Sequence, residues 1–264
     1  MEQLSLMDVS AVTTLLCDAD GTLFPSEEPA FEASVQVTNR FLESLGVPER
    51  YEAEELRLQG NGRNFQSTLT ELARRHGVAV DAEPFLTEVQ GWVDQENEVV
   101  TAHLASVLKP QPEVSGPLNR LAARLELAVV TSSALVRINA CLVSTGLDPL
   151  FAGASRFSAQ DSLERPTSKP DPAVYQLAGR VLGVLGDGSA PPRAVAVEDA
   201  VAGATSAVAA GFPTVGMLCF VPPAELAQRE QDLREVGVSA LVSSWEELAA
   251  LFSPAAATTE VGAR

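Results

Sequence analysis

Two aspartates one residue apart, Asp18 and Asp20, follow an apolar run and have the clearest capacity for chemistry in this sequence. The run Val12–Cys17 is rich in branched apolar side chains, a pattern typical of a buried strand in a parallel sheet. Gly21 follows, and glycine permits the sharp turn that must carry the chain away. Because two carboxylates buried together are costly unless positive charge neutralises them, the segment predicts a bound metal ion and an acid that does covalent chemistry.

Three further polar clusters lie where other predicted strands end or a helix begins. They are Thr131-Ser132-Ser133 after the apolar run 127–130, Lys169-Pro170-Asp171-Pro172 at the start of a helical pattern, and Glu198-Asp199 after the run 194–197. Singly, each cluster could be a turn, a helix cap, a surface lysine or acids that offset a helix dipole. In open parallel sheets the reactive site lies outside the carboxyl ends of the strands. Because the acidic and hydroxyl clusters follow strands, we expect the set at one edge of the sheet. There it offers acids, hydroxyls and a cation, a combination suited to phosphoryl transfer.

The positions of apolar residues predict an α/β fold. Apolar strand-like runs at 12–17, 127–130, 194–197, 214–217 and 239–242 alternate with helical patterns after residue 112. Such alternation indicates a Rossmann-like parallel sheet flanked by helices on both faces.

A second, helical unit interrupts this pattern. Between residues 24 and 112 the apolar residues recur at helical spacing, and no convincing strand is found. We therefore expect a discontinuous core domain formed by residues 1–23 and 113–264, with a small all-helical domain, 24–112, inserted after the first strand. The last residues, 253–264, are small and polar and are expected to form a disordered tail.

Composition limits the possible partners. The chain has 264 residues, 46% of them hydrophobic, and 18 basic against 35 acidic residues give a formal net charge of −17. This balance argues against nucleic acid as a partner, because phosphate neutralisation needs clustered Lys and Arg. An anionic substrate would need a local cation to offset the general repulsion. The oligomeric state is left open.

Cysteine usage and the apolar segments bear on the compartment. Cys17, Cys141 and Cys219 form no C-x-x-C pair, which favours buried thiols in a reducing compartment over a disulfide or a zinc site. No apolar stretch reaches the ~18 residues needed to span a bilayer. The segment Met1–Ser10 lacks a basic region typical of a secretory signal. We therefore expect a cytoplasmic protein with no membrane contact.

The order of the four clusters resembles a known family. Asp-x-Asp-Gly-Thr, a strand followed by Thr/Ser, Lys-Pro, and Glu-Asp-x-x-x-Gly in this order are similar to the motifs of the haloacid dehalogenase-like (HAD) hydrolases. Val197–Gly203, continuing to Gly211, resembles the signature of the subgroup with phosphoglycolate phosphatase-like and β-phosphoglucomutase-like enzymes. The insert 24–112 looks like the helical cap of that subgroup. The resemblance covers about Val12 to Leu251.

The resemblance and the residue chemistry together imply a phosphatase that hydrolyses a small phosphorylated metabolite, such as a sugar phosphate, through an aspartyl-phosphate. Asp18 would be the nucleophile, and Asp20 would be the general acid and base. Thr131 and the backbone N–H of Ser132 would bind phosphate oxygens. Lys169 would add positive charge next to both the phosphate and Asp18.

Magnesium is the cofactor that this chemistry implies, because it prefers oxygen ligands from one or two carboxylates, substrate phosphate and water. Asp18 and Asp199 would supply the carboxylates. Asp20 would contribute its backbone carbonyl, as the family resemblance implies. Glu198 is expected nearby, outside the direct ligands or bound through water.

Two segments outside the motifs have open interpretations. In Gly60–Asn64, Gly62 and Arg63 could contact the leaving group over the site, or the segment could be a helix connection with Asn64 as N-cap. The segment Ser155–Thr167 precedes Lys169 and could line the site entrance or form a surface loop.

Two alternative functions follow from the same residues. A phosphosugar mutase would keep the phosphate, but the segment Phe24–Phe31 lacks the histidine that mutases of this subgroup typically carry, and Pro25 stands where relatives often have an acid. A dehalogenase is disfavoured by the presence of Asp20, which those relatives lack. A non-catalytic regulatory protein with this fold is the alternative of a different class.

Overall fold

A six-stranded parallel sheet forms the centre of the protein. The computed structural model describes residues 9–60, 64–81, 83–186 and 190–253 of the chain. The strands are β1 (Thr14–Cys17), β2 (Glu126–Thr131), β3 (Arg156–Ser158), β4 (Ala194–Glu198), β5 (Thr214–Met217) and β6 (Ala240–Val242). Their order across the sheet is β3-β2-β1-β4-β5-β6, and every neighbouring pair is parallel. The predicted α/β fold is confirmed.

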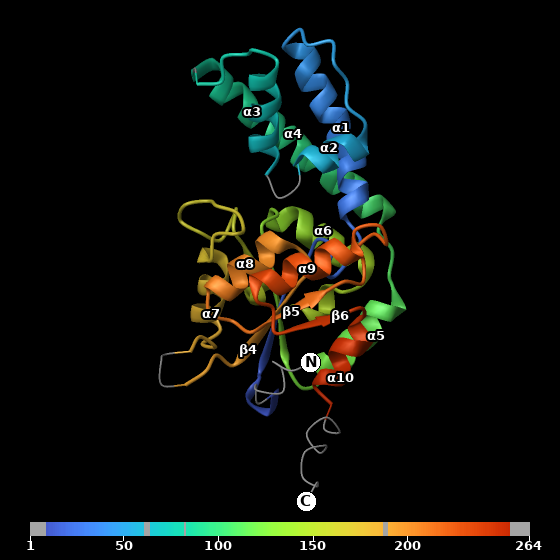
Figure 1. The fold of residues 1–264 in the computed structure, drawn as a ribbon, viewed down its shortest axis with the longest axis vertical. Helices are drawn as coiled ribbons and strands as arrows, with labels where there is room; N and C mark the ends of the chain where they lie inside the picture. Colours follow the sequence, from blue (N-terminus) through green and yellow to red (C-terminus); the bar gives the residue numbers. More distant parts are fainter. Residues whose placement is uncertain (1–8, 61–63, 82, 187–189, 254–264) are drawn as a thin grey trace, which may run out of the picture.

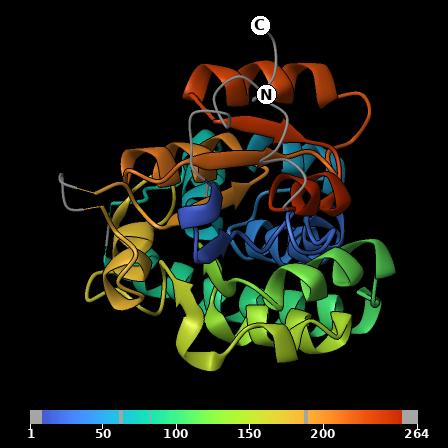
Figure 2. The ribbon, with the colours of Figure 1, turned by 90° about the horizontal axis from the view of Figure 1, so that it is seen from below.

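The first strand, β1, is one of the two central strands of the sheet. All four of its residues are buried, and it lies between β2 and β4. Figure 2 shows the molecule from below, and β1, drawn in blue, lies near its middle. Its apolar, branched residues suit a strand that is covered on both faces.

One strand, β3, was not expected from the sequence. It is three residues long, and Phe157 is the one large apolar residue among them. A strand this short at the edge of a sheet leaves no apolar run to detect. The segment 155–167 therefore begins with an edge strand.

Helices cover both faces of the sheet. They are α5 (Pro112–Ala122), α6 (Leu135–Thr145), α7 (Ala173–Val181), α8 (Val201–Ala209), α9 (Leu226–Val236) and α10 (Trp245–Leu251), with short 3₁₀ turns at Val9–Ala11, Asp148–Leu150 and Gly153–Ser155. Leu15 and Leu16 are neighbours in β1 and point to opposite faces. The apolar cluster of Leu15 includes residues of α5, α6 and α10, and that of Leu16 includes residues of α7 and α8.

Four helices between β1 and β2 form a helical insert, defined here as Glu27–Val107. They are α1 (Glu27–Ser44), α2 (Ala53–Gly60), α3 (Phe65–Arg75) and α4 (Glu83–Val107). They share an apolar cluster in which the Phe41 ring contacts Phe85 and Trp92 edge-on, with ring centroids 6.2 and 6.0 Å away. Figure 1 shows the insert at one end of the molecule, beyond the sheet. Where one domain ends and the other begins stays a prediction.

A buried ion pair connects the insert to a helix beside the sheet. Arg137 of α6 donates to Glu96 and Asn97 of α4 at 2.7 and 2.9 Å, and Ser34 of α1 donates to the other oxygen of Glu96 at 2.7 Å. Because Glu96 is buried, the arginine and the serine provide the partners that its carboxylate requires.

Three further expectations concern membrane-spanning helices, the cysteines and the end of the chain. None of the helices formed by the described residues is long and apolar enough to cross a lipid bilayer. All three cysteines are free thiols, and Cys17 and Cys141 are buried. The expected tail, apart from Ser253, lies outside the described residues.

Candidate functional site

The register of the sheet brings three strand ends together. Cys17 of β1 pairs with Val129 of β2 and Val197 of β4, so the residues that follow these positions reach the same edge. The Asp18 N–H donates to the carbonyl of Val197 at 2.9 Å, which fixes the first aspartate beside the end of β4. Asp18, Glu198 and Asp199 are all buried, and each offers a carboxylate oxygen within 4.8 Å of those of the others. These three residues are called the acid cluster below.

Lys169 lies among these acids. Its ammonium donates to Asp18 Oδ1 at 2.5 Å, to Glu198 Oε1 at 2.7 Å and to the carbonyl of Val130 at 2.7 Å. Burial acts to lower the pKa of Lys169, but the two carboxylates outweigh it and raise that pKa above its usual value. The lysine therefore stays charged and neutralises part of the cluster. The contact with Glu198 was not predicted from the sequence.

When ionised, the three acids of the cluster carry more negative charge than Lys169 can offset. Burial, followed by the repulsion between the carboxylates, raises the pKa of Glu198 to about 8 and that of Asp199 to about 7, and burial also raises the pKa of Asp18. A set of carboxylate oxygens this close together is the kind of site that a hard divalent cation such as Mg²⁺ occupies. The residues present thus fit the metal that the sequence implied.

Asp199 is held by the loop that follows β1. The Thr22 hydroxyl donates to Asp199 Oδ1 at 3.0 Å. Gly21 has a φ of +79°, and a Cβ there would lie 2.5 Å from Asp199 Oδ2, so only glycine fits the close approach. The indole N–H of Trp245 in α10 donates to the Thr22 carbonyl at 3.1 Å and anchors the loop from the far end of the chain.

Glu198 has a partner that sequence reasoning missed. The hydroxyl of Tyr175 in α7 donates to Glu198 Oε1 at 2.5 Å, so this oxygen accepts from both a tyrosine and Lys169. The sequence contains only a weak signal for this contact. Tyr175 is six residues after Lys169 on the helix that the Lys-Pro motif opens, where it resembles an ordinary apolar core position, yet its buried hydroxyl needs a partner.

Asp20 is held by two hydroxyl groups. Ser26, just before α1, donates to Asp20 Oδ1 at 2.6 Å, and Ser133 donates to Asp20 Oδ2 at 2.7 Å. Both serines lie in segments singled out in the sequence, but neither was predicted as a site residue. The second aspartate is therefore fixed between the start of the helical insert and the loop after β2.

The loop after β2 is supported from two sides. Thr131 Oγ1 accepts the N–H of Ser133 at 3.0 Å, and Ser132 Oγ accepts the N–H of Lys169 at 3.1 Å. Ser158 donates to the Ser133 carbonyl at 2.8 Å, and Asp161 accepts from the first N–H of α6. The segment 155–167 thus contains residues that support this loop, a role that neither alternative for it anticipated.

The segment Gly60–Asn64 was predicted to contact the leaving group or to connect two helices. Gly62 and Arg63 lie outside the described residues. Asn64 is the N-cap of α3, and its side chain accepts the N–H of Ser67 at 2.8 Å. The capping role considered for Asn64 is therefore observed.

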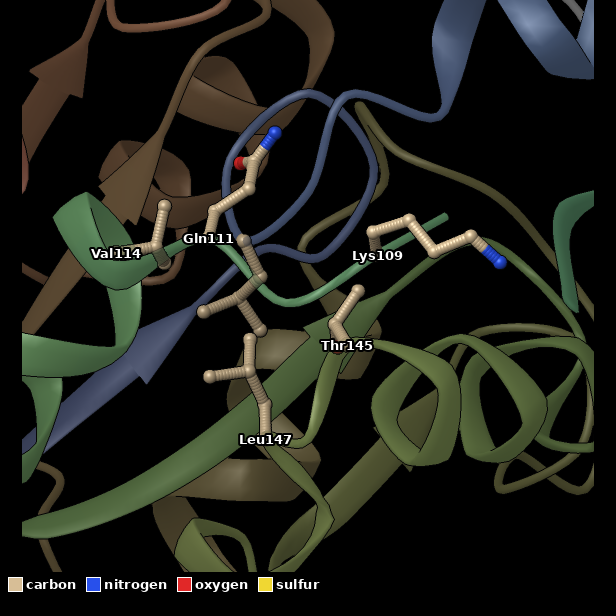
Figure 3. Close-up of a pocket in the computed structure, with 6 residues that line it drawn as sticks. Lys109, Gln111, Val114, Thr145 and Leu147 are labelled. Atoms are coloured by element: carbon tan, nitrogen blue, oxygen red, sulfur yellow. The ribbon is translucent and has the colours of Figure 1, made fainter. Parts of the chain in front are cut away.

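A shallow crevice lies beside the two connections to the insert. It is lined by Leu23, Lys109, Gln111, Val114, Thr145 and Leu147 (Figure 3). It encloses no space that a water molecule could occupy, and its lining does not include the acid cluster. The crevice is a packing feature of the connections rather than a ligand site.

The sequence matches a family model and a plant relative. A family model described as haloacid dehalogenase-like hydrolase matches residues 12–211. A CBBY-like protein of Arabidopsis thaliana is 27% identical over 213 residues, which are 78% of this chain and 64% of that protein. The chain thus spans less than two thirds of the length of that relative.

Solved structures share the fold over nearly the whole chain. A HAD family hydrolase from Deinococcus radiodurans, with bound phosphate and sodium, is 25% identical with a TM-score of 0.60, and the match covers 92% of this chain and 99% of that one. A predicted phosphoglycolate phosphatase from Haemophilus somnus is 20% identical with a TM-score of 0.68, over 92% and 99% of the two chains. The family resemblance indicated by the motifs is confirmed.

Replacing Gly203 should disrupt the acid cluster. A Cβ at this position in α8 would lie 1.8 Å from Glu198 Oε2, so Gly203→Ala must displace the carboxylate from Lys169 and Tyr175. Because breaking a buried charged pair is strongly destabilising, we expect a loss of about 3 kcal/mol or more in the free energy of unfolding, measured in urea.

Gly91→Ala is the matched control. Gly91 is exposed inside α4, where a Cβ would meet no atom within 4 Å. We expect this variant to be neutral or more stable by about 0.5–1 kcal/mol, because alanine is the better helix former. Equal stability of the two variants would contradict the assigned contact.

Proposed function

The chain belongs to the haloacid dehalogenase-like hydrolase family, and on that premise we propose that it is a magnesium-dependent phosphatase acting on a small phosphorylated metabolite. One observation carries the proposal: three buried carboxylates lie within reach of one cation, and the buried ammonium of Lys169 joins two of them. The relative from Deinococcus radiodurans, which has bound phosphate and sodium, supports a phosphate-binding function.

The metal would be held by Asp18 and Asp199, with the carbonyl of Asp20 as a further ligand and Glu198 acting through water. When bound, Mg²⁺ neutralises the acids and lets an anionic nucleophile approach an anionic phosphate. Glu198 Oε1 is already engaged by Lys169 and Tyr175, which supports a role for this residue outside the direct ligands.

The first chemical step belongs to Asp18 and Asp20. A carboxylate oxygen of Asp18 attacks phosphorus, the bond to the ester oxygen breaks, and Asp20 gives its proton to that leaving oxygen. Asp18 then carries the phosphoryl group. Thr131 stabilises the negative charge on the transferring group by donating a hydrogen bond to one of its oxygens, and Lys169 stabilises it with its positive charge.

The second step returns the enzyme to its starting state. Water attacks phosphorus, Asp20 takes a proton from it, and the bond between phosphorus and Asp18 breaks to release phosphate. Ser26 and Ser133 contribute by fixing both oxygens of Asp20 at the mouth of the site. We propose that the helical insert acts as a cap, and that its Gly62 and Arg63 contact the leaving group.

Hydrolysis of p-nitrophenyl phosphate tests this mechanism. We expect magnesium-dependent release of phosphate, loss of turnover to background in Asp18→Asn, and a decrease of about 10²–10⁴-fold in Asp20→Asn, because general acid–base catalysis contributes that much. Asp94→Asn is the control, since Asp94 is exposed in α4 and bonded to Gln90. Its activity should equal that of the unmodified protein.

Two results would contradict the proposal. Absence of turnover in the unmodified protein, or turnover that Asp18→Asn leaves unchanged, would favour a non-catalytic role. Conversion of a hexose 1-phosphate to the 6-phosphate without release of phosphate would favour a mutase.

Magnesium affinity should depend on pH. Because burial raises the pKa of Asp199 to about 7 and that of Glu198 to about 8, the metal-free cluster holds protons below these values, and a cation must displace them. We expect the Mg²⁺ dissociation constant to rise as pH falls from 8 to 6, by up to about tenfold per pH unit for each displaced proton. Calorimetry in buffers of different ionisation enthalpy counts the protons released, and a constant affinity would refute the prediction.

A further inference from the structure

Four charged side chains form a line from the helical insert to the acid cluster. Arg57 of α2 donates to Glu225 Oε1 at 2.5 Å, and Glu225 Oε2 lies 3.7 Å from a guanidinium nitrogen of Arg229 in α9. The other terminal nitrogen of Arg229 donates to the backbone carbonyl of Asp199 at 2.8 Å and lies 3.6 Å from its Oδ2. The line therefore ends on a proposed metal ligand.

Arg57 is tightly held within this line. It also pairs with Glu54 at 2.8 Å and with Glu27 at 3.5 Å, and only 11% of its side chain is exposed. Hydrogen bonds to Glu54 and Glu225 raise the pKa of Arg57 further above its usual value. Glu27 and Glu54 belong to the insert, whereas Glu225 lies just before α9. Among the ion pairs of Arg57, the pair with Glu225 therefore connects the insert to the sheet region.

Arg229 is shared between two carboxylates. Glu225 is four residues before Arg229, a spacing at which side chains on a helix can meet. The two charges nevertheless remain 3.7 Å apart while Arg57 engages Glu225, and the shorter contact of Arg229 is with Asp199. Without Arg57, Glu225 would lose the closer of its two cationic partners and would attract Arg229 away from the Asp199 carbonyl.

We propose that Arg229 is a positioning residue for Asp199, and that Arg57 of the insert keeps it there by occupying Glu225. The inference rests on the proposed function, because it treats Asp199 as a metal ligand. Cation affinity is then linked to the contact between the insert and α9. By thermodynamic reciprocity, a bound cation also strengthens that contact.

The direction in which one substitution changes the Mg²⁺ dissociation constant separates this positioning role from a long-range charge effect. Arg57→Met removes a positive charge, and long-range attraction alone would then make Mg²⁺ bind more tightly. Displacement of Arg229 releases the Asp199 carbonyl and carboxylate from their fixed positions, and Mg²⁺ binding becomes weaker. We expect the dissociation constant of Mg²⁺ to rise about fivefold to tenfold, which corresponds to a coupling at the lower end of the usual range for linked sites.

The test is a calorimetric titration of the full chain with Mg²⁺ alone. It compares the unmodified protein with Arg57→Met, Glu225→Gln and the double variant. Glu225→Gln removes the competitor for Arg229, so Arg57→Met should have no effect on the dissociation constant in that background. Arg50→Met is the matched control, because Arg50 forms an exposed ion pair with Glu43 inside the insert at 3.2 Å. It should bind Mg²⁺ like the unmodified protein.

The possible outcomes are distinct. An unchanged or tighter affinity in Arg57→Met, or the same weakening in the Glu225→Gln background, would overturn the positioning role. An unmodified protein that binds no Mg²⁺ would instead overturn the proposed function.

Arg229→Lys gives an independent measurement if Arg57→Met fails to fold. The lysine keeps the charge, but a single ammonium cannot donate to the Asp199 carbonyl and face Glu225 as the forked guanidinium does. We expect weaker Mg²⁺ binding with an unchanged melting temperature in the absence of metal. An unchanged dissociation constant in this variant would also overturn the inference.

Discussion

The burial of three carboxylates at one end of a parallel sheet is the constraint on which the rest of this structure depends. Asp18, Glu198 and Asp199 lie too close together to remain charged without compensation. Lys169 contacts two of them, and the Thr22 hydroxyl donates to the third. One ammonium cannot balance three carboxylates, and for that reason the cluster suits a hard cation.

The compensating groups come from every part of the fold. Tyr175 reaches Glu198 from α7, Trp245 holds the loop of Thr22 from α10, and Arg229 reaches Asp199 from α9. Glu198 and Asp199 are therefore supported from helices that pack on the sheet, whereas Asp18 is held by Lys169, which lies just before α7. Because Tyr175 and Trp245 are buried in helices, much of the support for this site comes from regular elements.

Polar contacts are part of what attaches the helical insert to the rest of the protein. Ser26 binds Asp20 at the start of α1, Arg57 binds Glu225, and Glu96 binds Arg137 of α6. Ala33, Val100 and Leu104 of the insert also belong to the buried apolar cluster that covers one face of the sheet. The insert is therefore joined to the sheet region by apolar packing as well as by ion pairs and hydroxyl contacts.

The sequence by itself determined the α/β fold, the positions of the acids at strand ends and the family. These follow from short-range patterns: apolar runs define strands, and parallel pairing forces the residues after Cys17 and Val197 to one edge. The motifs also placed Asp18, Asp199 and Lys169 together, but only the tertiary structure decided which other side chains meet them. The partners of Glu198 and Asp20, and the line from Arg57 to Asp199, join residues up to 168 positions apart. Such contacts depend on how helices pack and where their side chains point, and the local sequence does not specify either.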